Sequence, residues 1–172
     1  MKGSWFRISV IAVFLLTTYS LQLTTALFAQ EEFLASRKED VKKYISMLKS
    51  AREEDREEAA EALAEIADPS SVEPLMQALA NDKDPYVRES AAFALGEIGD
   101  RRAAGILLTA LKNDGDAYVR ESAAYSLGIV GDSSILSELQ AIANRENEVF
   151  VQDAIKDAII EIKTLEVQPI EY

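Results

Sequence analysis

The chain has 172 residues, with 30 Asp and Glu against 18 Lys and Arg, and it contains neither His nor Cys. The lack of these two residue types excludes a Ser-His-Asp triad, a Cys-His pair, zinc bound by His or thiolate, and a disulfide. The net charge of −12 argues against nucleic acid as a partner, because phosphate binding depends on clustered Lys and Arg.

Residues 1–29 have the pattern of an export signal peptide. Lys2 and Arg7 make a basic start, and an apolar core follows over residues 8–16. This core is shorter than the ~20 residues that span a bilayer. The sequence therefore predicts an exported protein, periplasmic or secreted, with no membrane segment after cleavage, and favours this over an uncleaved N-terminal anchor.

Residues 30–52 are predicted to form a single amphipathic helix. Their apolar residues recur at helical spacing, and they lack the motif that repeats further along the chain. We therefore interpret this helix as an N-terminal cap on the repeats. Its apolar residues are Phe33, Leu34, Val41, Tyr44, Ile45 and Leu48.

The rest of the chain is organised by an internal repeat. Residues 84–100 recur as residues 116–132, at an offset of 32 positions. Weaker copies precede and follow these two, as expected for the terminal units of a repeat array. The predicted units are residues 53–82, 83–114, 115–146 and a partial unit at 147–163, with a C-terminal tail at 164–172.

Each unit is predicted to contain two short helices. Apolar residues such as Val87, Ala91 and Leu95 recur at helical spacing, Asp84-Pro85 supplies a helix start, and Gly99 and its counterpart Gly131 mark helix ends. A lone helix pair cannot bury its apolar stripe, so neighbouring units must stack into a continuous core. The predicted fold is all-α, a right-handed α-solenoid of stacked two-helix repeats.

Two further glycines, Gly96 and Gly128, lie inside predicted helices. Glycine there costs about 1 kcal/mol relative to alanine. We therefore expect close contact between helices at both positions.

The segment Val-Arg-x-x-Ala-Ala-x-x-Leu-Gly-x-x-Gly-Asp, at 87–100 and 119–132, resembles the HEAT-like repeats of the phycobilisome-lyase type over about residues 53–163. This resemblance implies a solenoid that serves mainly as an interaction scaffold. The metal-dependent hydroxylases of this fold place His-Glu pairs directly after the repeat's Arg to hold iron. Here Glu89-Ser90 and Glu121-Ser122 occupy those places, so the resemblance does not extend to that activity.

Arginines recur at the repeat interval, and they are Arg56, Arg88 and Arg120. They could form a basic ladder for an anionic ligand. We favour a structural role, in which the planar guanidinium ties a helix end to a carboxylate of the repeat or to a neighbouring loop. The carboxylates considered for this role are Asp68, Asp100 and Asp132.

Aromatic residues recur on the first helix of each unit at positions that the core pattern leaves free. They could pack over the turns and between adjacent helices, or they could form an exposed surface that binds another protein. Carboxylates surround them in the sequence. The residues of this predicted protein-binding patch are Tyr86, Phe93, Tyr118, Tyr125, Ile129 and Phe150.

The sequence thus predicts a non-catalytic, exported scaffold for protein–protein interaction, whose negative charge would attract a basic partner. We assign no catalytic, cofactor-binding or metal-binding residue. Two alternatives remain open. One is an accessory subunit of a lyase-like enzyme, and the other is a structural module that associates with itself.

We expect the mature chain to begin at or near Gln30, because Ala29 offers a small residue at the cleavage site, with Ala26 as the alternative. Amino-terminal sequencing of the exported protein checks this prediction. A protein that retains Met1 would instead be anchored by its N-terminal segment.

Overall fold

The computed structural model describes residues 28–167, with side chains described through residue 165. The chain consists of two compact units, Met1–Asp40 and Val41–Tyr172. Residues 28–47 are helical, so the described part of the first unit is a helical segment. The predicted leader core and cleavage-site alternative at Ala26 lie outside the described residues. No helix within residues 28–167 is long and apolar enough to cross a membrane.

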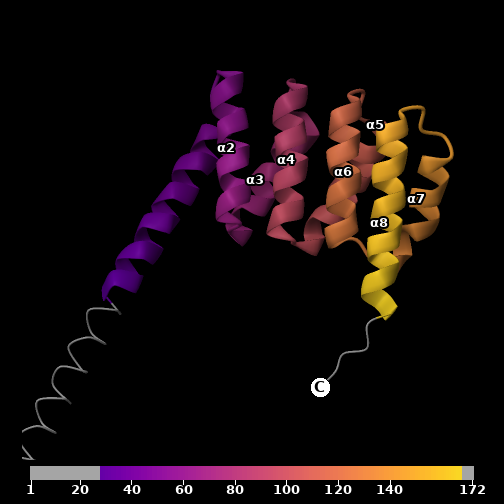
Figure 1. Cartoon of the computed structure of the whole chain (residues 1–172). Helices are drawn as coiled ribbons and strands as arrows, with labels where there is room; N and C mark the ends of the chain where they lie inside the picture. Colours follow the sequence, from indigo (N-terminus) through magenta and orange to yellow (C-terminus); the bar gives the residue numbers. More distant parts are fainter. Residues whose placement is uncertain (1–27, 168–172) are drawn as a thin grey trace, which may run out of the picture. The chain divides into compact units, whose positions relative to one another are not determined.

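The second unit is built from helices that alternate between a first and a second position in each repeat (Figure 1). The first helices are α2 (Glu53–Ile66), α4 (Pro85–Ile98), α6 (Ala117–Val130) and α8 (Val149–Val167). The second helices are α3 (Val72–Asn81), α5 (Ala104–Asn113) and α7 (Leu136–Ala143). Short 3₁₀ turns precede them, namely η1 (Pro69–Ser71), η2 (Arg101–Ala103) and η3 (Ser133–Ile135).

Two predicted boundaries differ from the structure. The helix expected over residues 30–52 covers 28–47, and residues 48–52 form the turn before α2. Helix α8 continues to Val167, beyond the start of the tail predicted at residue 164. Its last described side chains, including that of Leu165, are exposed, so apolar periodicity could not mark the end of this helix.

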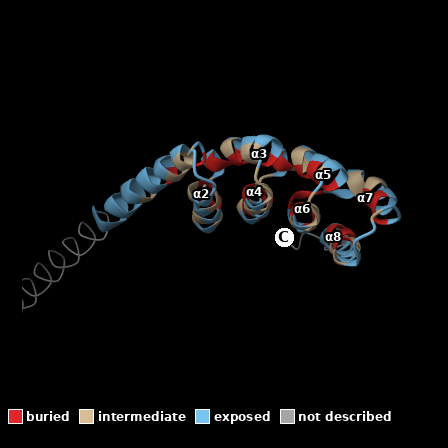
Figure 2. Ribbon diagram, turned by 90° about the horizontal axis from the view of Figure 1, so that it is seen from above, coloured by how far each residue is buried: buried red, intermediate tan, exposed pale blue. Residues whose placement is uncertain are grey.

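The helices of the second unit form two layers. Figure 2 shows α2, α4, α6 and α8 side by side in one layer and α3, α5 and α7 in the other, with buried faces turned toward each other. The core is repetitive, because leucines at equivalent positions of successive repeats are fully buried. These leucines are Leu63, Leu95 and Leu127 in the first helices and Leu75, Leu107 and Leu139 in the second helices. The fold is therefore an all-α solenoid of stacked two-helix repeats.

Both glycines inside helices lie at close helix contacts, as predicted. A side-chain carbon at Gly96 of α4 would fall on the Ser126 side chain of α6. The Ser126 hydroxyl donates a hydrogen bond of 2.8 Å to the Ala92 carbonyl of α4. At Gly128 of α6, the same carbon would lie 3.2 Å from the Ala158 Cα of α8. Adjacent first helices therefore approach closely enough for backbone and short side chains to touch.

The glycines at the helix ends differ from each other. Gly99 closes α4 in the left-handed conformation with φ of 72°, which favours glycine. Gly131 closes α6 as predicted, but in an extended conformation. It is tightly enclosed instead, because a side-chain carbon there would lie 2.5 Å from the Leu127 carbonyl oxygen.

Each repeat arginine binds the loop at the end of its own repeat. In the first repeat, Arg56 donates to both carboxylate oxygens of Asp82, from Nε at 2.6 Å and from Nη2 at 2.8 Å. Arg88 binds Asp114 in the same bidentate way, and Arg120 binds Glu146. All three carboxylates are at least nine-tenths buried.

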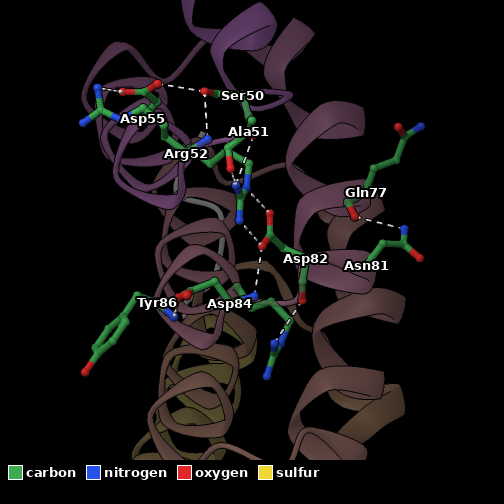
Figure 3. A network of polar contacts seen from close by, with 11 residues as sticks. Ser50, Ala51, Arg52, Asp55, Gln77, Asn81, Asp82, Asp84 and Tyr86 are labelled. Atoms are coloured by element: carbon green, nitrogen blue, oxygen red, sulfur yellow. Dashed lines mark hydrogen bonds and ion pairs between the residues drawn. The ribbon is translucent and has the colours of Figure 1, made fainter.

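The same arginines also bind the loop that precedes their own helix. Arg88 Nη1 donates to the Asp82 carbonyl at 3.0 Å, and Arg120 Nη1 donates to the Asp114 carbonyl at 3.0 Å. Asp82 therefore accepts from Arg56 through its side chain and from Arg88 through its backbone, and its Oδ1 also accepts from the Asp84 amide. Figure 3 shows Asp82 and Asp84 in this network. The arginines and loops form one continuous ladder from the first repeat to the loop that precedes α8.

The predicted pairing of these arginines with Asp68, Asp100 or Asp132 is wrong, and the neighbouring-loop alternative is correct. Each of these three carboxylates accepts a hydrogen bond from an amide of the 3₁₀ turn that follows it. Distance explains the error. Arg56 lies in the first turn of α2, whereas Asp68 lies beyond the end of the same helix. The two residues are 12 positions apart, which corresponds to about 18 Å of helical rise.

Two opposing effects act on the ladder carboxylates. Burial acts to raise the pKa of Asp82 and of Asp114, but hydrogen bonds from Arg56 and Arg88 and from loop amides outweigh it and hold both pKa values below their usual range. For Glu146, the hydrogen bond from Arg120 is the largest effect, and it lowers the pKa. The folded state therefore stabilises the ionised form of these carboxylates.

Replacing a repeated core leucine should destabilise the solenoid strongly. Leu95→Ala and Leu127→Ala should each lower the free energy of unfolding by about 2–5 kcal/mol, because each leaves a cavity in a fully buried position. Denaturant unfolding monitored by circular dichroism measures this. Leu165→Ala, at an exposed position of α8, is the control and should change stability by less than about 0.5 kcal/mol. Equal midpoints for all three variants would contradict the core assignment.

The ladder should make stability depend on pH on the acid side. Because the folded-state pKa of Asp114 is lowered, its pairing stabilises the fold above about pH 4, and this is lost as the pH falls through the folded pKa. Asp114→Asn should cost about 2–4 kcal/mol at pH 7, since it leaves the largely buried Arg88 side chain, 17% exposed, without its charged partner. It should also reduce the fall in stability between about pH 5 and pH 3.

The matched control is Asp153→Asn, which removes an exposed ion pair with Lys156 and should cost less than about 1 kcal/mol. Urea unfolding at a series of pH values checks both variants. Equal losses from the two substitutions would show that the ladder contributes no more than a surface ion pair.

Candidate functional site

The predicted patch residues lie on the first helices α4, α6 and α8. Five of the six are exposed, between 40% for Ile129 and 63% for Tyr86, and Phe150 is partly buried against the core. Exposed aromatic residues at equivalent positions of α4 and α6, beside the partly buried Phe150 of α8, are unusual for a surface that only faces water. We call this surface, defined by Tyr86, Phe93, Tyr118, Tyr125, Ile129 and Phe150, the aromatic face.

Rings of successive repeats contact each other on the aromatic face. Phe93 of α4 and Tyr125 of α6 are stacked, with ring centroids 5.8 Å apart and an interplanar angle of 17°. Tyr118 of α6 and Phe150 of α8 have centroids 5.4 Å apart and an angle of 30°. Contact between repeats and exposure to solvent, set out above as alternatives, thus occur together at these residues.

An open groove of about 770 Å³ runs between α6 and α8. We call it the main groove. Its apolar walls come from Phe93, Tyr125, Ile129 and Phe150, and the small residues Gly128, Ala154 and Ala158 lie along its base. Tyr86 and Tyr118 are not among its lining residues. The structure therefore brings four of the six predicted patch residues into one groove and leaves two tyrosines near the start of their helices.

All ionisable residues lining the main groove, tyrosine aside, are acidic. They are Glu121 of α6 and Asp153, Asp157 and Glu161 of α8. The three on α8 are spaced four residues apart, which places them in a row with about 6 Å between neighbours. The groove thus joins an apolar wall to a line of negative charge.

A second, smaller groove of about 420 Å³ lies on the other side of Phe93. Its carboxylates are Glu61 and Glu65 of α2 and Glu89 and Glu97 of α4. Phe93 and Ser122 line both grooves. The ring pair Phe93–Tyr125 therefore stands between two acidic grooves.

The negative charges on this layer influence one another. Burial raises the pKa of Glu89 above its usual value, and the charges of Asp116, Glu121 and Glu57 raise it further. Glu57, Glu89 and Glu121 occupy equivalent positions of three successive repeats, so the stacking of the solenoid places like charges next to each other. A bound positive charge would therefore reduce the repulsion between these carboxylates.

The repeat arginines lie elsewhere. Arg56, Arg88 and Arg120 line neither groove, since their guanidinium groups are held by the loops. Within residues 28–167, no group of three or more acidic side chains is arranged to hold a metal ion. The chemistry that the grooves offer is apolar contact, ring stacking and attraction of cations.

Sequence reasoning identified the aromatic residues but missed the base of the groove. Gly128 was interpreted as a helix contact, which is correct, yet the same contact with Ala158 keeps the space between α6 and α8 free of large side chains. Small residues at Ala154 and Ala158 carried the missing signal. They could have been recognised by aligning α8 with α6, since the aromatic position of Tyr125 becomes Asp157 in α8.

Comparisons with known proteins agree with the architecture. The family model described as HEAT repeats matches residues 41–128 and 72–160. No match to a curated protein was found by sequence comparison. Among solved structures, human deoxyhypusine hydroxylase in complex with glycerol is similar, with a TM-score of 0.65 and 21% identity.

That similarity covers 80% of this chain and 49% of the hydroxylase chain, so the protein spans about half the length of this neighbour. At 21% identity the likeness concerns the fold. The family match covers most of the chain, including every complete repeat described above. The chain belongs to the HEAT-repeat family.

Proposed function

We propose that this protein is an exported, non-catalytic scaffold that binds another protein through its aromatic face. The observation that carries the proposal is the set of exposed aromatic side chains around an open groove. Aromatic residues are enriched in interface cores and supply most of the binding energy there. A scaffold role is also the usual use of stacked helical repeats, whose extended surfaces suit protein recognition.

Several features support a role without catalysis. The chain contains no His and no Cys, which removes the usual bases, nucleophiles and soft metal ligands. Glu89-Ser90 and Glu121-Ser122 stand where the hydroxylase branch of this fold would place His-Glu pairs. We also propose that the repeats are most similar in sequence to those of the phycobilisome-lyase type. This similarity implies no lyase activity.

Export belongs to the proposal because of the leader sequence. Lys2, Arg7 and the apolar core over residues 8–16 have the order of a signal peptide. The partner would then be another exported or surface protein. A cysteine-free repeat fold suits such a compartment, because it is held by packing and the arginine ladder and has no thiols to oxidise.

The triple change Tyr86→Ser, Tyr118→Ser and Tyr125→Ser should abolish partner binding with little loss of stability. We expect the free energy of unfolding to fall by about 1–3 kcal/mol, because two ring contacts are lost at about 0.5–1.5 kcal/mol each. Three fully buried aromatic residues would cost about 3–5 kcal/mol each. The amount of partner protein retained by the tagged whole chain should fall at least about tenfold, since aromatic residues supply most of the binding energy of an interface.

The matched control is Val149→Ser, Ile160→Ser and Leu165→Ser, which removes three exposed apolar side chains of α8 that do not line the main groove. This control should retain the same proteins as the wild type. Unchanged retention by the tyrosine variant would overturn the proposal. A wild-type dimer in sedimentation that the tyrosine variant dissociates would show instead that the face joins two copies of the chain.

A further inference from the structure

The main groove combines two features that a single ligand must satisfy. On the α4 and α6 side it presents exposed rings and an aliphatic side chain from Phe93, Tyr125 and Ile129. On the α8 side it presents the carboxylate row Asp153, Asp157 and Glu161. An occupant must therefore bring apolar surface and positive charge, side by side.

The break in the ring stacking explains why both features meet at this groove. Equivalent positions in the four first helices are Glu61, Phe93, Tyr125 and Asp157. Phe93 stacks on Tyr125, but the next repeat offers Asp157 in place of a ring. The outer face of Tyr125 thus borders the groove beside a carboxylate, where a cation can contact both.

The charges of the groove are largely uncompensated. Lys156 donates to Asp153 at 2.8 Å, and this is an exposed ion pair. Among the residues that the structure describes, Glu121, Asp157 and Glu161 have no ion-pair partner. A basic occupant would supply the missing countercharges, whereas an acidic one would be repelled.

The shape of the groove indicates the form of the occupant. Its lining residues on α8 extend from Phe150 to Glu161, about 16 Å along the helix axis. The carboxylates of the row stand about 6 Å apart. Cations four residues apart on a second helix have the same spacing, and the neighbouring stripe of that helix can carry the apolar side chains.

We propose that the main groove binds a basic amphipathic helix of a partner protein, with Lys or Arg side chains against the α8 row and apolar side chains against Tyr125 and Ile129. This inference rests on the proposed function and specifies the partner's chemistry. A guanidinium or ammonium group also lies over the Tyr125 ring. The base of small residues, Gly128, Ala154 and Ala158, admits the apolar side chains.

A synthetic peptide provides the test. The probe has about 18 residues, or five helical turns, with Lys at every fourth position on one stripe and Leu on the next. A second peptide has the same composition in scrambled order. In about 0.15 M salt, where the Debye length is about 8 Å, the amphipathic peptide should bind the whole chain about tenfold more tightly than the scrambled one. Equal affinities, or no binding, would overturn the inference.

Two charge-matched variants separate the groove from general attraction by an acidic protein. Asp153→Asn, Asp157→Asn and Glu161→Gln should weaken peptide binding about tenfold, because three countercharges are removed. Glu58→Gln, Glu73→Gln and Glu138→Gln remove the same charge away from the grooves, and also one exposed ion pair, Lys112–Glu138. This control should change affinity less than about threefold. Equal weakening by both variants would overturn the inference.

The proposed function and this inference fail in different ways. If the α8 variant still retains the proteins that the wild type retains, while the tyrosine variant loses them, the partner is not basic and the aromatic face still binds. If the tyrosine variant retains them, the proposed function itself fails. Thermal melts of the two carboxylate variants should match the wild type within a few degrees, because every changed carboxylate is at the surface.

Discussion

The binding of each repeat arginine to the loops at both ends of its repeat is the interaction on which the rest of the solenoid depends. A two-helix unit buries its apolar stripe only if the next unit arrives at a fixed position and angle. Hydrophobic contact is not directional, so it favours stacking without fixing the register. A guanidinium that binds two carboxylate oxygens and a backbone carbonyl is directional. In Arg88 these partners belong to the loops on both sides of its repeat.

This register determines which surface side chains meet. When successive first helices are held at equivalent heights, residues 32 positions apart lie side by side. Phe93 then faces Tyr125, and Tyr118 faces Phe150. The same geometry places Glu57, Glu89 and Glu121 in one line, and their proximity contributes to the raised pKa of Glu89. The aromatic face and its acidic surroundings are thus consequences of the repeat interval, expressed at positions that the core does not need.

Much of this arrangement could be predicted because the sequence repeats. The repeat and its helical periodicity predicted the paired helices and their buried apolar stripe, and the cost of glycine inside a helix predicted the close contacts at Gly96 and Gly128. The partners of the arginines were missed, although Asp82, Asp114 and Glu146 recur at the same interval. A recurring loop acid resembles an ordinary turn residue, and helical rise was needed to show that Asp68 lies too far from Arg56. Whether the aromatic residues were exposed depended on packing between repeats, which periodicity does not determine.

The main groove lies where the sequence departs from the repeat. A perfect array would continue the rings from Phe93 and Tyr125 into α8 and would close the surface with a third aromatic residue. Asp157 stands there instead, and the neighbouring positions Ala154 and Ala158 are small. A short, charged residue fills less space than a ring and leaves Tyr125 partly exposed. Since α8 still needs its buried residues Ile155 and Ile162 to close the core, the change is confined to the outer side of this helix. The terminal repeat therefore completes the core with one side and forms the acidic wall of the groove with the other.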